Sequence, residues 1–156
     1  MKASAYVETT IVSYLTSRPS RDLIRAAEQE LTRQWWATRS RFDLYTSALV
    51  RREAAAGDPQ AAQRRLDVLL DLPEAPMGDD VVALADRLLQ EAALPQKAAA
   101  DALHIAVAVV HRLDYLVTWN CTHIANAAMR AKIEAVVRGV GLRPTIICTP
   151  MELLAE

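Results

Sequence analysis

The chain has 156 residues, the length of one ordinary domain, and 52% of them are hydrophobic and 24% charged. This composition is typical of a globular protein and argues against a disordered or fibrous chain. The net charge of −1 is an average of two unlike halves. Residues 1–65 carry 11 Lys and Arg against 7 Asp and Glu, whereas residues 66–156 carry 7 against 12. We therefore expect a single domain over residues 1–156, with its arginines gathered in the N-terminal half.

Several further classes of protein are not expected. The opening residues MKASAYVETT include no apolar stretch that could act as a signal peptide, and the longest apolar segment, 102–110, is far shorter than the ~20 residues of a membrane span. Cys121 and Cys148 make neither a disulfide framework nor a zinc-site spacing. We expect a cytoplasmic protein.

Short β-type runs alternate with longer helical runs along the chain. Strands are predicted at residues 3–7, 42–47, 74–77, 115–119 and 145–149. Helices are predicted at residues 11–15, 19–39, 48–56, 59–72, 81–93, 96–112 and 122–138, with a last turn from residue 150. Strands separated by such helices favour right-handed crossovers. The expected fold is therefore α/β, a three-layer arrangement with a parallel sheet of about five strands and helices on both faces.

Four polar side chains are placed near the carboxyl ends of these strands, where open α/β sheets bind their ligands. Glu8 directly follows the first strand, and Asn120 follows the strand 115–119. Glu53 lies in the first turns after the strand 42–47. Asp101 lies in a helix that is apolar on nearly every side, where an uncompensated carboxylate costs several kcal/mol.

Each of these residues also has a purely structural interpretation. Glu8 could stabilise the dipole of the following helix, and Glu53 could pair with a neighbouring arginine. Asp101 could pair with Lys97 or face solvent, and Asn120 could be a turn or cap residue. Their joint placement at one edge of the sheet nevertheless favours a site for a hard cation. Oxygen ligands without cysteine indicate Mg²⁺ or Mn²⁺, which support phosphodiester chemistry.

Five segments occur in an order that resembles a known family: YVETTIVSYL, SALVRREAAAGDP, DALHIAVAVV, DYLVTWNCTHIAN and IICTPMELL. They resemble a PIN domain, specifically the VapC-like toxins of type II toxin–antitoxin systems, over essentially the whole chain. The resemblance implies a five-stranded parallel sheet with helices on both faces. It also implies a metal-dependent endoribonuclease that acts on RNA and is blocked by a cognate antitoxin.

The resemblance also assigns site residues. The four acidic positions of the family fall on Glu8, Glu53, Asp101 and Asn120, and its hydroxyl residue falls on Thr118. Positions 8 and 120 are commonly Asp in the family. Here Glu8 is one methylene longer and Asn120 is neutral, so the site carries a charge of about −3 rather than −4 and should hold divalent metal more weakly.

On this basis we expect Asp101 and Glu8 to hold one Mg²⁺ or Mn²⁺, with Glu53 and Asn120 completing the shell directly or through water. Thr118 and Thr9 would orient the carboxylates or the phosphate.

Contacts to RNA and to proteins are also predicted. The candidate RNA-binding residues are Arg51, Arg52, Thr9 and His123. His104, three residues after Asp101, is interpreted as a core histidine, with an RNA contact as the alternative. The helix 19–39 offers a surface for an antitoxin or for a second copy of the chain, as in a homodimer.

Two other functions compete with the nuclease. The first is a PIN-like binding module for RNA or an antitoxin that has lost efficient cleavage because Asn120 replaces an acid. The second is a receiver-like phosphoacceptor domain. That domain needs an Asp at the end of a middle strand and a Lys near the last strand, and the sequence has neither.

Overall fold

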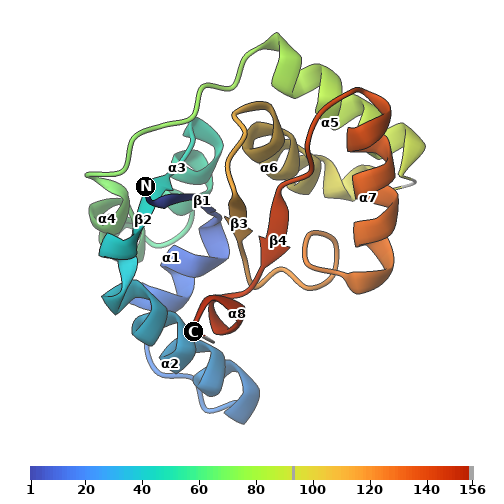
Figure 1. Ribbon diagram of the computed structural model, residues 1–156. Coiled ribbons are helices and arrows are strands. Elements are labelled where there is room, and N and C mark those ends of the chain that lie inside the picture. Colours follow the sequence, from blue (N-terminus) through green and yellow to red (C-terminus); the bar gives the residue numbers. More distant parts are fainter. Residues whose placement is uncertain (93, 155–156) are drawn as a thin grey trace.

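The computed structural model describes residues 1–92 and 94–154. Within them one parallel sheet is formed by Ala3–Val7 (β1), Phe42–Tyr45 (β2), Tyr115–Val117 (β3) and Ile146–Cys148 (β4) (Figure 1). The strand order is β2-β1-β3-β4. Because all strands run in the same direction, their carboxyl ends meet at one edge of the sheet.

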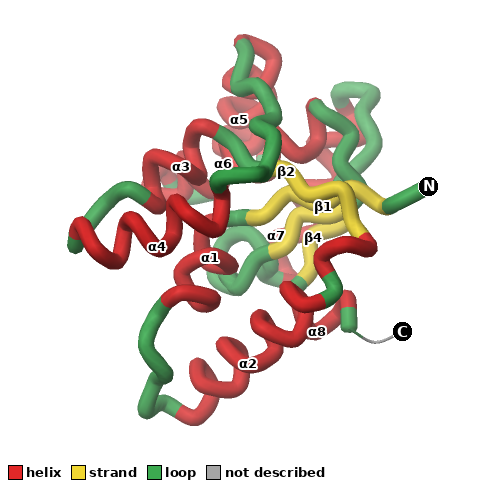
Figure 2. Tube along the Cα trace, turned by 90° about the vertical axis from the view of Figure 1, so that its left-hand side faces the viewer, coloured by secondary structure: helices red, strands yellow, loops and turns green. Residues whose placement is uncertain are grey.

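Helices cover both faces of this sheet. They are α1 (Thr9–Thr16), α2 (Leu23–Ala37), α3 (Ala48–Ala54), α4 (Pro59–Leu69), α5 (Asp79–Glu91), α6 (Ala99–Val110), α7 (Ala127–Gly139) and α8 (Pro150–Leu153). Short 3₁₀ turns at Arg39–Arg41 and Gln96–Ala98 precede β2 and α6. Figure 2 shows the sheet between α5 and α6 on one side and α2 and α8 on the other. The predicted three-layer α/β fold is confirmed.

The sheet has four strands in the described residues rather than the expected five. The segment 74–77, predicted as a strand, pairs only through an isolated parallel bridge between Glu74 and Thr46. Two backbone bonds hold it there, from the Thr46 amide to the Pro73 carbonyl and from the Ala75 amide to the Thr46 carbonyl. The pairing ends after one bridge because the partner segment turns into α3 at Ala48, directly after the helix cap Ser47.

Two helices begin later than predicted because of their capping residues. α2 begins at Leu23 rather than at residue 19, since the Asp22 carboxylate accepts the Arg25 amide and caps the helix. α7 begins at Ala127 rather than at residue 122, because the Asn126 side chain caps it. The last residue of the helix predicted at 81–93 lies outside the described residues.

The core lies between the sheet and its two helical layers. The second half of β1 is completely buried, and α6 is buried along most of its length. This explains why the α6 sequence is apolar on nearly every side. No helix in the described ranges is long and apolar enough to cross a membrane. Polar side chains that remain in this core are concentrated at the carboxyl edge of the sheet.

Candidate active site

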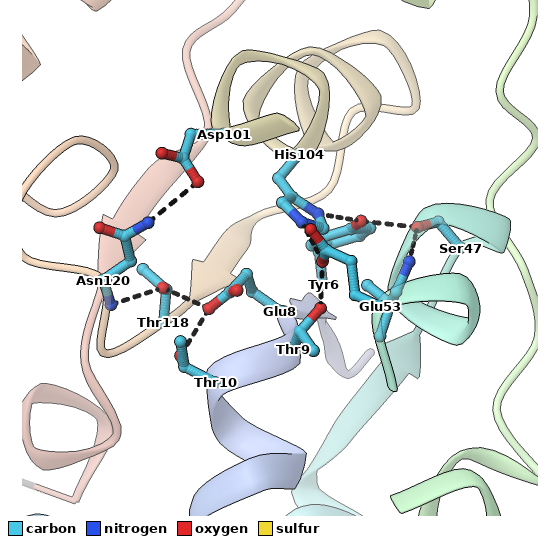
Figure 3. A network of polar contacts seen from close by, with 11 residues as sticks. Tyr6, Glu8, Thr9, Thr10, Ser47, Glu53, Asp101, His104, Thr118 and Asn120 are labelled. Atoms are coloured by element: carbon cyan, nitrogen blue, oxygen red, sulfur yellow. Dashed lines mark hydrogen bonds and ion pairs between the residues drawn. The ribbon is translucent and has the colours of Figure 1, made fainter. Parts of the chain in front are cut away.

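Glu8 is positioned by the end of β1. Its amide continues the sheet by donating to the Val117 carbonyl at 3.2 Å, and the residue is only 4% exposed. One carboxylate oxygen, Oε1, accepts hydrogen bonds from the hydroxyls of Thr10 at 2.5 Å and Thr118 at 2.6 Å (Figure 3). Thr118 directly follows β3, the neighbour of β1, and this brings its hydroxyl to Glu8.

Glu53 reaches the same edge from α3. The Ser47 hydroxyl caps this helix by accepting the Val50 amide at 3.1 Å, which fixes where the helix begins after β2. The Glu53 Oε1 atom accepts the Thr9 hydroxyl at 2.5 Å and lies 2.8 Å from Nε2 of His104. The side chain of Glu53 is 32% exposed, so it is open to solvent on one side.

Glu8 and Glu53 thus converge with the same pattern of bonds. One ligand atom from each of them and one from His104 all lie within 4.8 Å of one another. In each glutamate two donors hold Oε1, whereas Oε2 receives no hydrogen bond within residues 1–92 and 94–154. We call Glu8 and Glu53 the glutamate pair.

The charge of the glutamate pair has no compensating Lys or Arg ion pair among the described residues. Two nearby carboxylates repel each other, and the burial of Glu8 strengthens that repulsion because water screens it poorly. A divalent cation with oxygen ligands would relieve this repulsion. The donor set therefore fits a hard divalent metal ion.

Three effects act on the pKa of Glu53. Burial alone would raise it, but hydrogen bonds from His104 and Thr9, together with the charge of Arg52, act in the opposite direction and the pKa lies below its ordinary value. Glu53 therefore stays ionised at neutral pH and remains available as a cation ligand.

Asp101 lies in a second group beside the glutamate pair. Its Oδ1 accepts the side-chain amide of Asn120 at 2.9 Å, and its Oδ2 lies 2.9 Å from Nδ1 of His123. The Asn120 backbone amide in turn donates to the Thr118 hydroxyl, which bonds Glu8. The neutral residue at position 120 is thus a hydrogen-bond donor to Asp101, a role that an ionised Asp could not perform. Among the ion pairs of the described residues, none joins Asp101 to Lys97.

The structure places the predicted RNA-binding residues in different surroundings. Arg52 is exposed and near enough to lower the pKa of Glu53. Arg51 instead binds Glu74 at 2.6 Å and the backbone carbonyls of Leu69, at the end of α4, and Leu72, so any phosphate contact would compete with these bonds. The Thr9 hydroxyl donates its proton to Glu53. His123 contacts Asp101 through Nδ1, and its Nε2 has no hydrogen bond to the described residues.

Sequence reasoning missed the participation of His104 and Tyr6. His104 is 1% exposed, as a core histidine would be, but both of its ring nitrogens bond side chains rather than backbone. Its spacing of three residues from Asp101 places both on one side of α6, and that spacing was the available signal. Tyr6 could not be recognised because its hydroxyl lies in the middle of a buried strand.

The buried hydroxyl of Tyr6 predicts a dependence of stability on alkaline pH. Burial, followed by the charges of Glu8 and Glu53, raises the pKa of Tyr6 far above its ordinary 10.0, although the Ser47 hydrogen bond acts in the opposite direction. A group whose pKa is raised on folding stabilises the protein fully below its unfolded pKa and loses that contribution as pH rises above it. Denaturant unfolding should therefore show stability falling above about pH 10.

Tyr6→Phe should reduce this alkaline loss, while Tyr45→Phe, at a partly exposed position of β2, should leave it in place. Equal slopes of stability against pH in all three proteins would contradict the assignment.

Comparisons with known proteins identify the fold. No model of a protein family matches the chain, and no curated protein sequence matches it. A crystal structure of VapBC2 from Rickettsia felis, bound to a DNA fragment from their promoter, contains a similar chain. The TM-score is 0.54 at 13% sequence identity, and the match covers 93% of this chain and 97% of that chain. The fold is PIN-like. At this identity the similarity establishes the fold only.

Proposed function

We propose that this protein is a Mg²⁺- or Mn²⁺-dependent endoribonuclease that hydrolyses phosphodiester bonds of RNA, and that it is the toxin of a type II toxin–antitoxin system. The observation that carries the proposal is the glutamate pair, which places two carboxylates at the carboxyl edge of a PIN-like sheet without an ion pair to Lys or Arg among the described residues. The sequence motifs and the structural neighbour support the same assignment.

The free Oε2 atoms of the glutamate pair would hold the metal ion, and Asp101 and Asn120 would complete its shell directly or through water. Such an ion activates water and neutralises charge that develops on a phosphodiester. The chain's own contribution is to fix the ligands. The hydroxyls of Thr10 and Thr118 orient Glu8, while Thr9 and His104 orient Glu53. Exposed Arg52 would attract the phosphate.

The start of α2 supports an antitoxin partner. Leu23 and Ile24 are 86% and 73% exposed, and Met151 of α8, a helix in contact with α2, is 57% exposed. Large apolar side chains exposed in this way are typical of a protein interface. The VapBC2 structure is itself a complex bound to promoter DNA. We propose that a cognate antitoxin binds along α2 and α8, and that the other possible occupant is a second copy of this chain in a homodimer.

One observation favours the alternative function, a binding module without efficient cleavage. Both carboxylate oxygens of Asp101 already have partners in the chain, Asn120 and His123. If these bonds persist in the presence of metal, Asp101 does not ligate, and the protein binds RNA or its antitoxin without cutting.

RNA cleavage by the purified protein decides between the two functions. We expect cleavage with Mn²⁺ or Mg²⁺, its loss in excess chelator, and a fall of at least about a hundred-fold in Asp101→Ala. Glu134→Gln, which removes an exposed carboxylate on α7, is the matched control and should cleave normally. Cleavage that persists unchanged in Asp101→Ala or in chelator contradicts the proposal. RNA binding without cleavage or Mn²⁺ uptake supports the binding module.

A further inference from the structure

A chain of buried polar side chains leads from the interior of the protein to Glu53. The Ser47 hydroxyl lies 2.7 Å from the Tyr6 hydroxyl, which lies 2.7 Å from Nδ1 of His104, and Nε2 of His104 lies 2.8 Å from Glu53 Oε1 (Figure 3). Ser47, Tyr6 and His104 are each at most 1% exposed. Ser47 caps α3, Tyr6 lies in β1 and His104 lies in α6, so these hydrogen bonds join three elements of the fold.

The direction of these hydrogen bonds follows from their end points. An ionised carboxylate can only accept, so the ring proton of His104 lies on Nε2 and is donated to Glu53. A neutral imidazole then has a lone pair on Nδ1, which accepts the proton of the Tyr6 hydroxyl. The Ser47 oxygen accepts the Val50 amide, and its own proton goes to the Tyr6 oxygen. Every donor in the chain is used once, and the series ends on Glu53.

We propose that His104 is a positioning residue that donates from Nε2 to Glu53 Oε1, held in this tautomer by Tyr6 and Ser47, so that the Oε2 atom of Glu53 would be left available to the metal ion. The role in metal binding rests on the proposed function, whereas the tautomer does not. Because three buried side chains set the ring orientation, Glu53 is fixed before any cation arrives. The Thr9 hydroxyl, bonded to the same oxygen, reinforces this orientation.

The opposite tautomer would give His104 a different role. With its proton on Nδ1, His104 would donate to the Tyr6 oxygen, and the bare Nε2 would be a metal ligand in its own right. The lone pair of Nε2 would then face an ionised oxygen of Glu53 at 2.8 Å, which is repulsive in the metal-free protein. The observed contact therefore favours the donor role.

Nitrogen NMR of the histidine rings in the metal-free protein tests the tautomer directly. At about pH 8.5, where ordinary imidazoles are neutral, we expect the proton of His104 on Nε2. His123 contacts Asp101 through Nδ1, so its proton should lie on Nδ1, and this ring provides an internal comparison. Signals are assigned with His104→Gln and His123→Gln. A proton found on Nδ1 of His104 would overturn the proposal, whatever the protein does to RNA.

Calorimetric titration with Mn²⁺ tests the positioning role without any measurement of activity. Tyr6→Phe and His104→Leu should each weaken Mn²⁺ binding by about ten-fold or more, as expected for partners of a metal ligand. His104→Gln, whose amide can still donate toward Glu53, should recover part of the affinity lost in His104→Leu. Thr145→Val is the control. It removes a buried hydroxyl that bonds the Leu113 carbonyl and takes no part in the hydrogen bonds between Ser47, Tyr6, His104 and Glu53.

The outcomes separate the inference from the proposed function. Unchanged Mn²⁺ affinity in folded Tyr6→Phe and His104→Leu overturns the positioning role, and so does an equal loss in Thr145→Val. Absence of Mn²⁺ binding by the wild-type protein contradicts both the proposed function and the positioning role. The NMR measurement of the His104 tautomer is independent of that result and still tests the direction of the hydrogen bonds. Folding of each variant is checked by denaturant unfolding.

Discussion

Glu8→Gln is expected to stabilise the metal-free protein by about 0.5–2 kcal/mol while reducing Mn²⁺-dependent RNA cleavage by at least about a hundred-fold. Gln keeps an oxygen that can accept the hydroxyls of Thr10 and Thr118, so the local hydrogen bonds survive. It removes a carboxylate that is 4% exposed and has no Lys or Arg partner among the described residues. The repulsion with Glu53 disappears, and so does a metal ligand.

The measurements are urea unfolding in chelator and RNA cleavage in Mn²⁺. Glu134→Gln, the exposed carboxylate on α7, should change neither quantity beyond a few tenths of a kcal/mol. A variant that gains stability and loses activity is typical of a site where a residue is kept for function at a cost in stability. A Glu8→Gln protein that is less stable in chelator, or that cleaves RNA at the wild-type rate, would show that the carboxylate has a structural role.

Asn120→Asp is expected to tighten Mn²⁺ binding by about ten-fold and to destabilise the metal-free protein by about 1–3 kcal/mol. The Asn120 amide donates to Asp101 at 2.9 Å, and an Asp at this position replaces that hydrogen bond with a second carboxylate. Without metal the carboxylates of Asp101 and Asp at position 120 would repel each other, which raises the pKa of one of them. With metal the added charge strengthens the site.

Asn126→Asp is the matched control for this prediction. Asn126 caps α7 through its side-chain oxygen, and Asp caps helices equally well, so the variant adds the same charge nearby without entering the site. It should leave Mn²⁺ affinity nearly unchanged. Calorimetry and urea unfolding measure both quantities. If Asn120→Asp binds Mn²⁺ no more tightly than the wild-type protein, position 120 does not belong to the metal shell.

Much of the fold could be predicted because its elements have local signals. β1 is a short apolar run, and the Asp58–Pro59 pair marks the start of α4 as predicted. The two failures have different causes. The predicted strand 74–77 has the right composition, but its partner segment enters α3 at Ala48, which limits the pairing to one bridge. The predicted start of α7 ignored Asn126, whose cap decides where the helix begins.

The candidate site could be predicted only in part. Parallel strands must bring their carboxyl ends to one edge, which is why Glu8 and Asn120 were expected there and are found there. The site consists of two groups of side chains: Glu8 and Glu53 converge, while Asp101 bonds Asn120 and His123. This grouping could not be predicted from the sequence. Side-chain orientation decides this grouping. The same applies to Arg51, whose bonds to Glu74 and to backbone carbonyls have no signature in the sequence.

The central claim is that the glutamate pair holds a divalent cation, and a Mn²⁺ titration by calorimetry tests it most directly. The wild-type protein should show saturable binding of at least one ion per chain, competed by Mg²⁺. The double variant Glu8→Gln/Glu53→Gln should fold, as judged by urea unfolding, and should show no such binding. No saturable heat in the wild-type protein, or the same binding in the folded double variant, would contradict the claim.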